Sequence, residues 1–235
     1  MPAPLSIIIP TLNAAGVLPA LMQDLMEGIA AGMIREVILA DGGSSDATAA
    51  IAEDTGARLV TTEPGRGIQL AEGCTAARAD WLLILHADTD LPSNWPAVLR
   101  QHMQDWPEQA AAFRLSFGSR HPMARVTAGW ANLRTRLFGL PYGDQGLLVP
   151  ASLYRACGGY PDLRLMEDVA MARRLKGRIR LLPAKVKTSA TRFEENGWLT
   201  QGTRNLWRLV RYLLGSKSAS DPAGYDAAPP SNCKR

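Results

Sequence analysis

The chain has 235 residues, enough for one α/β domain with a sizeable core. Its formal net charge of +4 suits an anionic ligand or an acidic membrane surface, but no run of Lys and Arg with interleaved aromatic residues supports nucleic acid binding. Its three cysteines are widely spaced, which excludes a disulfide framework and favours a reducing, cytoplasmic location.

The first 92 residues alternate short apolar strands with helices. Strands are predicted over residues 6–9, 36–40, 58–62 and 81–85, and helices over 17–29, 44–55 and 67–78. The run from Trp81 to Leu85 is typical of a parallel strand buried on both faces. Ser44 or Ser45 is the expected N-cap of the second helix. This alternation predicts an α/β fold, a three-layer α/β/α sandwich around a mostly parallel sheet.

The pattern is less regular after Pro92. Helices are predicted over residues 96–106, 123–138, 167–176 and 198–214, and strands over 111–117, 147–149 and 179–188, the last broken at Pro183. We expect one domain over residues 1–215, with a nucleotide-binding half at about 5–92 and an acceptor-binding half at about 93–215. Residues 216–235 are rich in Ser, Ala, Pro and Asp, and are predicted to form a disordered tail.

Polar or glycine-rich clusters follow the strands of the regular half. They are Pro10-Thr11-Leu12-Asn13, Asp41-Gly42-Gly43-Ser44-Ser45-Asp46, Gly65-Arg66-Gly67-Ile68-Gln69 and His86-Ala87-Asp88-Thr89-Asp90. Because the carboxyl ends of parallel strands meet at one edge of a sheet, these clusters predict one composite site. Asp88 and Asp90, with His86 before them, would suit Mg²⁺ or Mn²⁺ carrying a phosphate-bearing substrate. Alternatively, the two aspartates cap the helix that begins near Ser93.

Three further side chains have candidate roles. Asp41, taken as an uncharged acid, would pair with the imide of a uracil-type base, and Arg66 would face a diphosphate. Glu167 and Asp168 open a helix, where acids favour the helix dipole; the functional alternative is a general base tuned by neighbouring carboxylates. No G-x-G-x-x-G follows the first strand, and neither a P-loop nor a G-x-S-x-G motif occurs, which disfavours dinucleotide oxidoreductases, P-loop NTPases and nucleophile-elbow hydrolases.

Together these clusters resemble the family 2 glycosyltransferases, which have a GT-A fold. The matching segments are 6–13 (opening strand), 41–46 (D-D-G-S-x-D), 85–92 (L-D-A-D-D-x-x-P) and 167–168 (E-D). The chain departs from these patterns at Leu12, Ala14, Gly42 and His86. The G-R-G-x-Q, H-A-D-T, G-D-Q-G and M-E-D-V elements are similar to a cytoplasmic subgroup labelled arsenosugar-biosynthesis or carotenoid-type glycosyltransferases.

The resemblance implies an inverting glycosyltransferase that moves a sugar from a nucleotide-diphosphate donor, a UDP-sugar, to an acceptor hydroxyl. It makes Asp168 the catalytic base with Glu167 beside it, and puts a divalent metal, Mg²⁺ or Mn²⁺, on Asp88, with His86 and Asp90 as further candidate ligands. The implied nucleotide-binding residues are Pro10, Thr11, Asn13, Asp41, Gly43, Arg66, Gln69, Ala87 and Asp88. Asp144 and Gln145 of the G-D-Q-G element would line the acceptor side.

Two other functions stay open. Because the chain departs from the family patterns, a non-catalytic nucleotide- or sugar-binding module is an alternative function. A sugar-phosphate nucleotidyltransferase is less favoured, because its usual glycine-rich, arginine-containing loop after the first strand is absent.

The last predicted helix is amphipathic. Leu199, Leu206, Leu209, Val210 and Leu213 lie on one face, and Arg204, Arg208 and Arg211 on the opposite one. The first interpretation is a helix that covers the core with a solvated basic face. The alternatives are a subunit contact, or an interfacial helix on anionic lipid, which would bring the enzyme to a lipid-like instead of a small-molecule acceptor. No apolar run approaches the roughly 18 residues of a membrane span, so we expect at most peripheral membrane contact and leave the oligomeric state open.

Overall fold

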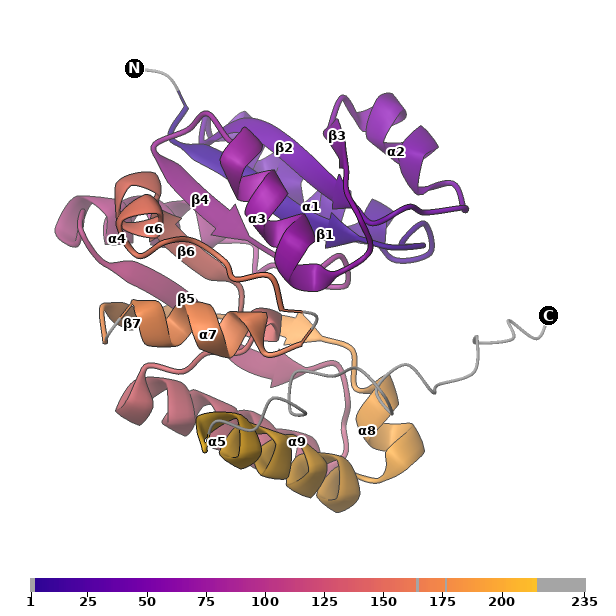
Figure 1. The fold of residues 1–235 in the computed structure, drawn as a ribbon, viewed down its shortest axis with the longest axis vertical. Coiled ribbons are helices and arrows are strands. Elements are labelled where there is room, and N and C mark those ends of the chain that lie inside the picture. The colour runs from indigo at the N-terminus through magenta and orange to yellow at the C-terminus, as the bar shows by residue number, and fades with distance from the viewer. Residues whose placement is uncertain (1–2, 164, 176, 215–235) are drawn as a thin grey trace.

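A seven-stranded sheet runs through the molecule (Figure 1). The computed structural model describes residues 3–163, 165–175 and 177–214. The strands are β1 (Leu5–Thr11), β2 (Ile34–Asp41), β3 (Arg58–Thr61), β4 (Trp81–Ile84), β5 (Ala110–Phe117), β6 (Leu147–Pro150) and β7 (Ile179–Thr188), in the order β3-β2-β1-β4-β6-β5-β7. Strands β3, β2, β1 and β4 are parallel, as are β5 and β7, while β6 is antiparallel to both of its neighbours. The predicted α/β fold with a mostly parallel sheet is confirmed.

Helices cover both faces of the sheet. They are α1 (Leu18–Ala30), α2 (Thr48–Thr55), α3 (Arg66–Ala76), α4 (Trp95–Asp105), α5 (Pro122–Phe138), α6 (Ala151–Ala156), α7 (Glu167–Arg174), α8 (Thr191–Asn196) and α9 (Trp198–Leu213), with a 3-10 turn η1 (Gly143–Gln145). Successive residues of β1 enter opposite cores: Ile7 and Ile9 pack with α1 and α4, and Ile8 packs with α3, α6 and α7. A strand buried on both faces requires this unbroken apolar run.

The topology gathers the loops that follow the strands at one edge. The chain leaves β1 toward β2 and β3 on one side and later returns to β4 on the other, so the boundary between β1 and β4 is a topological switch point, where α/β proteins bind ligands. Because β6 is antiparallel to β4, its first residue Leu147 lies opposite Ile84, the last residue of β4. The turn η1 therefore meets the loop after β4 at this same edge.

Two local expectations are corrected. Strand β7 continues through Pro183, because its register with β5 shifts there and Pro183 lies exposed on an edge strand, where a missing N–H is tolerated. Helix α2 begins only at Thr48, because Ser44 belongs to the preceding loop, and Asp46 accepts a hydrogen bond from the Thr48 N–H at 3.0 Å. The predicted tail, residues 216–235, lies outside the described residues. Within the described ranges, each helix is too short or too polar to cross a membrane.

Candidate active site

Side chains tie the loop after β1 to the loop after β2. Asn13 Oδ1 accepts from the Ser45 N–H at 2.9 Å, and the Asn13 N–H donates to Ser44 Oγ at 2.8 Å. Asn13 adopts the left-handed backbone region at φ 51°, which asparagine tolerates better than most residues. These paired bonds make the two loops one unit.

Asp41 is the centre of this unit. One carboxylate oxygen accepts from Thr11 Oγ1 at 2.9 Å and from Ser44 Oγ at 2.5 Å, and the other accepts from the N–H groups of Gly43 and Ser44. Burial raises the pKa of Asp41, but these hydrogen bonds outweigh it, so that the pKa is lowered overall. Asp41 is therefore ionised at neutral pH, which corrects the expectation of an uncharged acid. Four hydrogen bonds already use the roughly four lone-pair positions of this carboxylate, so an imide N–H must displace one of them.

Gln69 explains one departure from the family pattern. Its Nε2 donates to the carbonyl oxygens of Thr11 at 2.7 Å and Ala40 at 2.9 Å, so the amide braces the ends of β1 and β2. A Cβ at Gly42 would lie 3.1 Å from the same nitrogen. The position where the family has a second aspartate is therefore crowded by Gln69, a buried brace in this structure. Pro10 and Ala87 present half-buried apolar side chains at this edge.

Arg66, the first residue of α3, is held from two sides. Its Nη2 lies 3.2 Å from Nδ1 of His86, and its Nε lies 3.6 Å from Oε1 of buried Glu167. A guanidinium only donates, so Nδ1 accepts and the neutral ring carries its proton on Nε2. Burial, with the charges of Arg66 and Arg192, lowers the pKa of His86 well below its ordinary value. His86 is thus neutral and positions Arg66, and its candidate role as a metal ligand stays a prediction.

Glu167 is the second support of Arg66. Burial and the charge of Asp168, opposed by Arg66, raise the pKa of Glu167 to about 7. An acid this deeply buried next to a guanidinium orients its partner and offers little surface of its own to a substrate. We therefore regard Glu167, predicted as catalytic, as a positioning residue.

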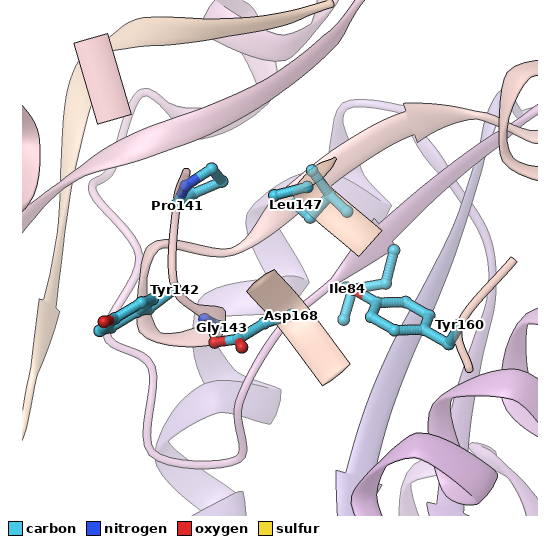
Figure 2. Close-up of a pocket in the computed structure, with 8 residues that line it drawn as sticks. Ile84, Pro141, Tyr142, Gly143, Leu147, Tyr160 and Asp168 are labelled. Atoms are coloured by element: carbon cyan, nitrogen blue, oxygen red, sulfur yellow. Dashed lines mark hydrogen bonds between the residues drawn. The ribbon is translucent and has the colours of Figure 1, made fainter. Parts of the chain in front are cut away.

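Asp168 lies at the start of α7, facing the turn before β6. Its Oδ2 accepts from the Gly143 N–H at 2.8 Å and its Oδ1 from the Val169 N–H at 2.7 Å. The chain enters α7 through Met166, which has a left-handed backbone at φ 65°; such strain clusters at functional sites. Figure 2 shows the carboxylate of Asp168 beside Gly143, at a pocket lined by Ile84, Pro141, Tyr142, Gly143, Leu147, Tyr160, Asp168 and Ala172. Asp168 places a carboxylate in a lining that is otherwise largely apolar.

Asp144 carries an unsatisfied oxygen. Its Oδ1 is buried and has no hydrogen-bond partner. Burial raises the pKa of Asp144 to about 6; Arg134 opposes this shift, while the charges of Asp168 and Asp88 add to it. The carboxylates of Asp88, Asp144 and Asp168 therefore lie within electrostatic reach of one another. Gln145, by contrast, is fully buried and bonds Phe113 O and Thr135 Oγ1, so it anchors the turn and has no exposed atom for an acceptor.

Arg134 and Tyr142 were not predicted from the sequence. Arg134 is buried, donates from Nε to Leu140 O at 2.9 Å and stacks 3.5 Å from the centre of the Tyr142 ring. Its Nη2, like the Asp144 oxygen, is buried without a partner. One feature of the sequence could have revealed Arg134. It follows Ala131 by three residues, which puts it on the side of α5 that faces the sheet. An arginine there predicts a buried charge that needs a carboxylate or an anion.

The residues around Asp88 fit a divalent cation that arrives with a diphosphate. No group of three or more His, Cys, Asp or Glu within the described ranges could hold a metal ion by itself. Mg²⁺, however, commonly binds one or two carboxylates together with substrate phosphates. Asp88 is exposed, and the unpartnered oxygen of Asp144 belongs to the same group of charges.

Asp90 does not belong to this group. Its Oδ2 lies 3.2 Å from Lys187 Nζ, and its backbone pairs with Lys187. Asp90 is thus paired with Lys187 in this structure, and its metal role stays a prediction. The alternative of a helix cap is wrong, because α4 begins at Trp95 without a side-chain cap.

Comparison with known proteins places this arrangement in a family. The model of the glycosyl transferase family 2 matches residues 6–146. A PGL/p-HBAD biosynthesis glycosyltransferase of Mycobacterium bovis is 40% identical over 99 residues, which cover 39% of this chain and 38% of that protein. The chain thus spans well under half the length of this curated relative.

Solved structures share the fold. S. aureus TarS (residues 1–349) has a TM-score of 0.64 at 15% identity, covering 91% of this chain and 66% of that one, and has also been solved with UDP-GlcNAc. Glucosyl-3-phosphoglycerate synthase from Mycobacterium tuberculosis, solved with Mn²⁺, UDP and glucosyl-3-phosphoglycerate, has a TM-score of 0.55 at 17% identity, covering 80% and 70%. These likenesses confirm the GT-A fold. With a family match over well more than half of its length, the chain belongs to the glycosyl transferase family 2.

Proposed function

We propose that the protein is an inverting glycosyltransferase that moves a sugar from a nucleotide-diphosphate donor, a UDP-sugar, to an acceptor hydroxyl. The observation that carries this proposal is the juxtaposition, at one edge of the sheet, of a doubly supported arginine and a backbone-oriented aspartate. Arg66 provides the positive charge that a leaving diphosphate needs, and Asp168 provides the base that the acceptor needs. Family membership and the UDP-bound structures of similar fold support this assignment.

On the donor side, the N–H of the uracil imide bonds the Asp41 carboxylate in place of one of the hydrogen bonds that this carboxylate accepts within its loop. Arg66 contacts the diphosphate and stabilises the charge that develops as the bond to C1 of the sugar breaks. A divalent cation held by Asp88 and Asp144 would supply further charge neutralisation when bound. His86 and Glu167 act through Arg66, which they hold in one orientation.

On the acceptor side, Asp168 takes the proton of the hydroxyl as its oxygen attacks C1 and the C1–O bond to the diphosphate breaks. One displacement inverts the anomeric centre, so no second carboxylate is required as a nucleophile. The N–H groups of Gly143 and Val169 hold the carboxylate in place from two sides. This differs from a non-catalytic binding module, which needs no oriented base.

The UDP nucleotide, the divalent metal, the class of acceptor and the cytoplasmic location all stay predictions. So does the arsenosugar or carotenoid subgroup, because none of the relatives named above carries either label. A nucleotidyltransferase remains the less favoured alternative.

The test is turnover by the Asp168→Asn variant with UDP-glucose and related UDP-sugars, followed as UDP release to water or added alcohols. We expect a loss of at least about 100-fold, because general-base catalysis is typically of that size, with unchanged UDP affinity. Asp162→Asn, at an exposed aspartate outside the pocket lining, is the matched control. Near-wild-type turnover by Asp168→Asn would show that Asp168 is not the base. A wild-type protein that binds UDP and turns over none of the donors would favour the binding module.

A further inference from the structure

Helices α5 and α9 pack against each other and form one edge of the molecule, at the bottom of Figure 1. Helix α5 contacts the sheet through a stripe of small residues, Ala124, Ala128 and Ala131. Helix α9 is anchored at its start by Trp198, which packs among Phe117 and Phe193. Both helices therefore use only part of their surface to join the protein.

The apolar stripe of α9 is not buried, which corrects the first interpretation of this helix. Of the predicted apolar face only Leu209 is buried, while Leu199, Leu206, Val210 and Leu213 are exposed, with Leu199 at 71%. Trp207 is 64% exposed beside them. An isolated exposed leucine is ordinary, but a continuous stripe of this kind marks an interaction surface.

Helix α5 carries a second stripe of the same kind. Its exposed members recur at helical spacing on the side away from the sheet, with Trp130 at 50%, and are Val126, Trp130, Leu133 and Leu137, followed by Phe138 at the helix end. We call the two stripes together, with Leu199, Leu206, Trp207, Val210 and Leu213 from α9, the α5–α9 face. The two helices that carry this face pack against each other at one edge of the molecule (Figure 1).

The charge on the two helices has a single sign. Arg125 and Arg136 are exposed on α5, and Arg204 and Arg211 are exposed on α9. Neither helix contains an aspartate or a glutamate. An apolar surface with exposed tryptophans, on helices whose charged residues are all arginines, matches the interfacial helices that rest on anionic lipid.

We propose that the α5–α9 face binds the surface of an anionic lipid bilayer, with its tryptophans and leucines at the headgroup boundary and its arginines on lipid phosphates. A second copy of the chain fits less well. A twofold contact would bring the arginines of both copies together, and neither helix supplies a carboxylate to neutralise them.

Helix α9 also contacts the elements of the candidate active site. Leu209 and Tyr212 of α9 pack in one cluster with Met166 and Val169, which flank Glu167 and Asp168 in the chain. Helix α9 therefore lies between a bilayer on the α5–α9 face and the elements that hold the proposed base. Resting on the proposed function, this placement makes the acceptor an amphiphile whose hydroxyl is presented at the headgroup level.

The experiment is flotation of the full chain with vesicles of equimolar phosphatidylglycerol and phosphatidylcholine, and with phosphatidylcholine alone. We expect binding to the anionic vesicles that weakens in high salt. The double variant Trp130→Ala/Trp207→Ala should partition at least about tenfold more weakly, because two exposed aromatic anchors are lost. Trp106→Ala, at a tryptophan that is 40% exposed at the end of α4, is the matched control and should float like wild type. Arg125→Gln/Arg204→Gln should lose binding to anionic vesicles, unlike Arg155→Gln on α6.

Three results would overturn the proposal: no flotation of wild type with anionic vesicles, undiminished flotation of the double tryptophan variant, or self-association that this variant abolishes while wild type does not float. UDP titration of the same preparations keeps the two proposals separate. A wild type that binds UDP without floating contradicts only the membrane surface. A wild type that floats without binding UDP contradicts only the donor assignment.

Discussion

Replacement of Asp144 by asparagine should stabilise the protein increasingly as the pH rises. Burial of this carboxylate raises its pKa from 3.8 to about 6. The folded state therefore holds the proton more tightly than the unfolded state, so the free energy of unfolding falls as the pH rises from about 4 to about 6 and stays low above that. At about 1.36 kcal/mol per pKa unit, the full penalty is roughly 3 kcal/mol. The Asp144→Asn variant cannot ionise and escapes this penalty.

Urea unfolding of wild type and Asp144→Asn between pH 4 and pH 8 measures the effect. We expect the stability of the variant relative to wild type to grow by about 2 kcal/mol across this range, with most of the change below pH 6.5. Asp162→Asn, at an exposed aspartate, controls for the loss of one negative charge. Mn²⁺ together with UDP should stabilise wild type more than the variant, because a cation favours the ionised carboxylate. A stability difference that is the same at pH 4 and pH 8 would refute the reasoning.

The remaining predictions concern the metal, the support of Arg66 and one close backbone approach. Asp88→Asn should weaken Mn²⁺-dependent UDP binding by at least about tenfold, whereas Asp90→Asn should leave it unchanged; calorimetry that finds equal losses would contradict the metal assignment. Turnover should decline as the pH falls through about 7, where Glu167 takes up a proton and loses its ion pair, and a lower but flatter pH profile is expected for Glu167→Gln. Gly67→Ala should cost about 1–3 kcal/mol in urea unfolding, because its Cβ would lie 2.4 Å from a backbone oxygen. Gly129→Ala, with nothing within 4 Å, should be neutral or stabilising by about 0.5–1 kcal/mol, and equal effects at both glycines would contradict the packing argument.

The regular half of the fold could be predicted because its signals are local. An apolar run such as Trp81 to Leu85 has a strand's length and needs cover on both faces, and helices on either side supply that cover. Topology alone predicts that the loops carrying Asp41, Arg66 and Asp88 lie at one edge of the sheet, since the parallel strands before them end there. The predicted break at Pro183 was wrong, because a proline stops a central strand, whereas β7 is an edge strand with a register shift.

The partners of individual side chains were not predictable, because they depend on which loops meet across the sheet. His86 comes to Gly143 only because β6 runs antiparallel to β4 and brings the turn η1 beside the loop after β4. Asp90 accepts a hydrogen bond from Lys187, which is distant in the sequence. The orientation of α9 could not be predicted from the sequence either. The pattern gives its apolar face, but whether that face points inward depends on where Trp198 docks.

The most direct test of the central claim is calorimetric titration of UDP into the purified protein with Mn²⁺ and with EDTA, using GDP as the control ligand. The account predicts UDP binding that is tight with Mn²⁺, much weaker with EDTA, and stronger than binding of GDP. Absence of UDP binding under both conditions would contradict the assignment of this edge of the sheet as a nucleotide-sugar site. Equal binding with Mn²⁺ and EDTA would contradict the roles of Asp88 and Asp144 and leave the diphosphate to Arg66.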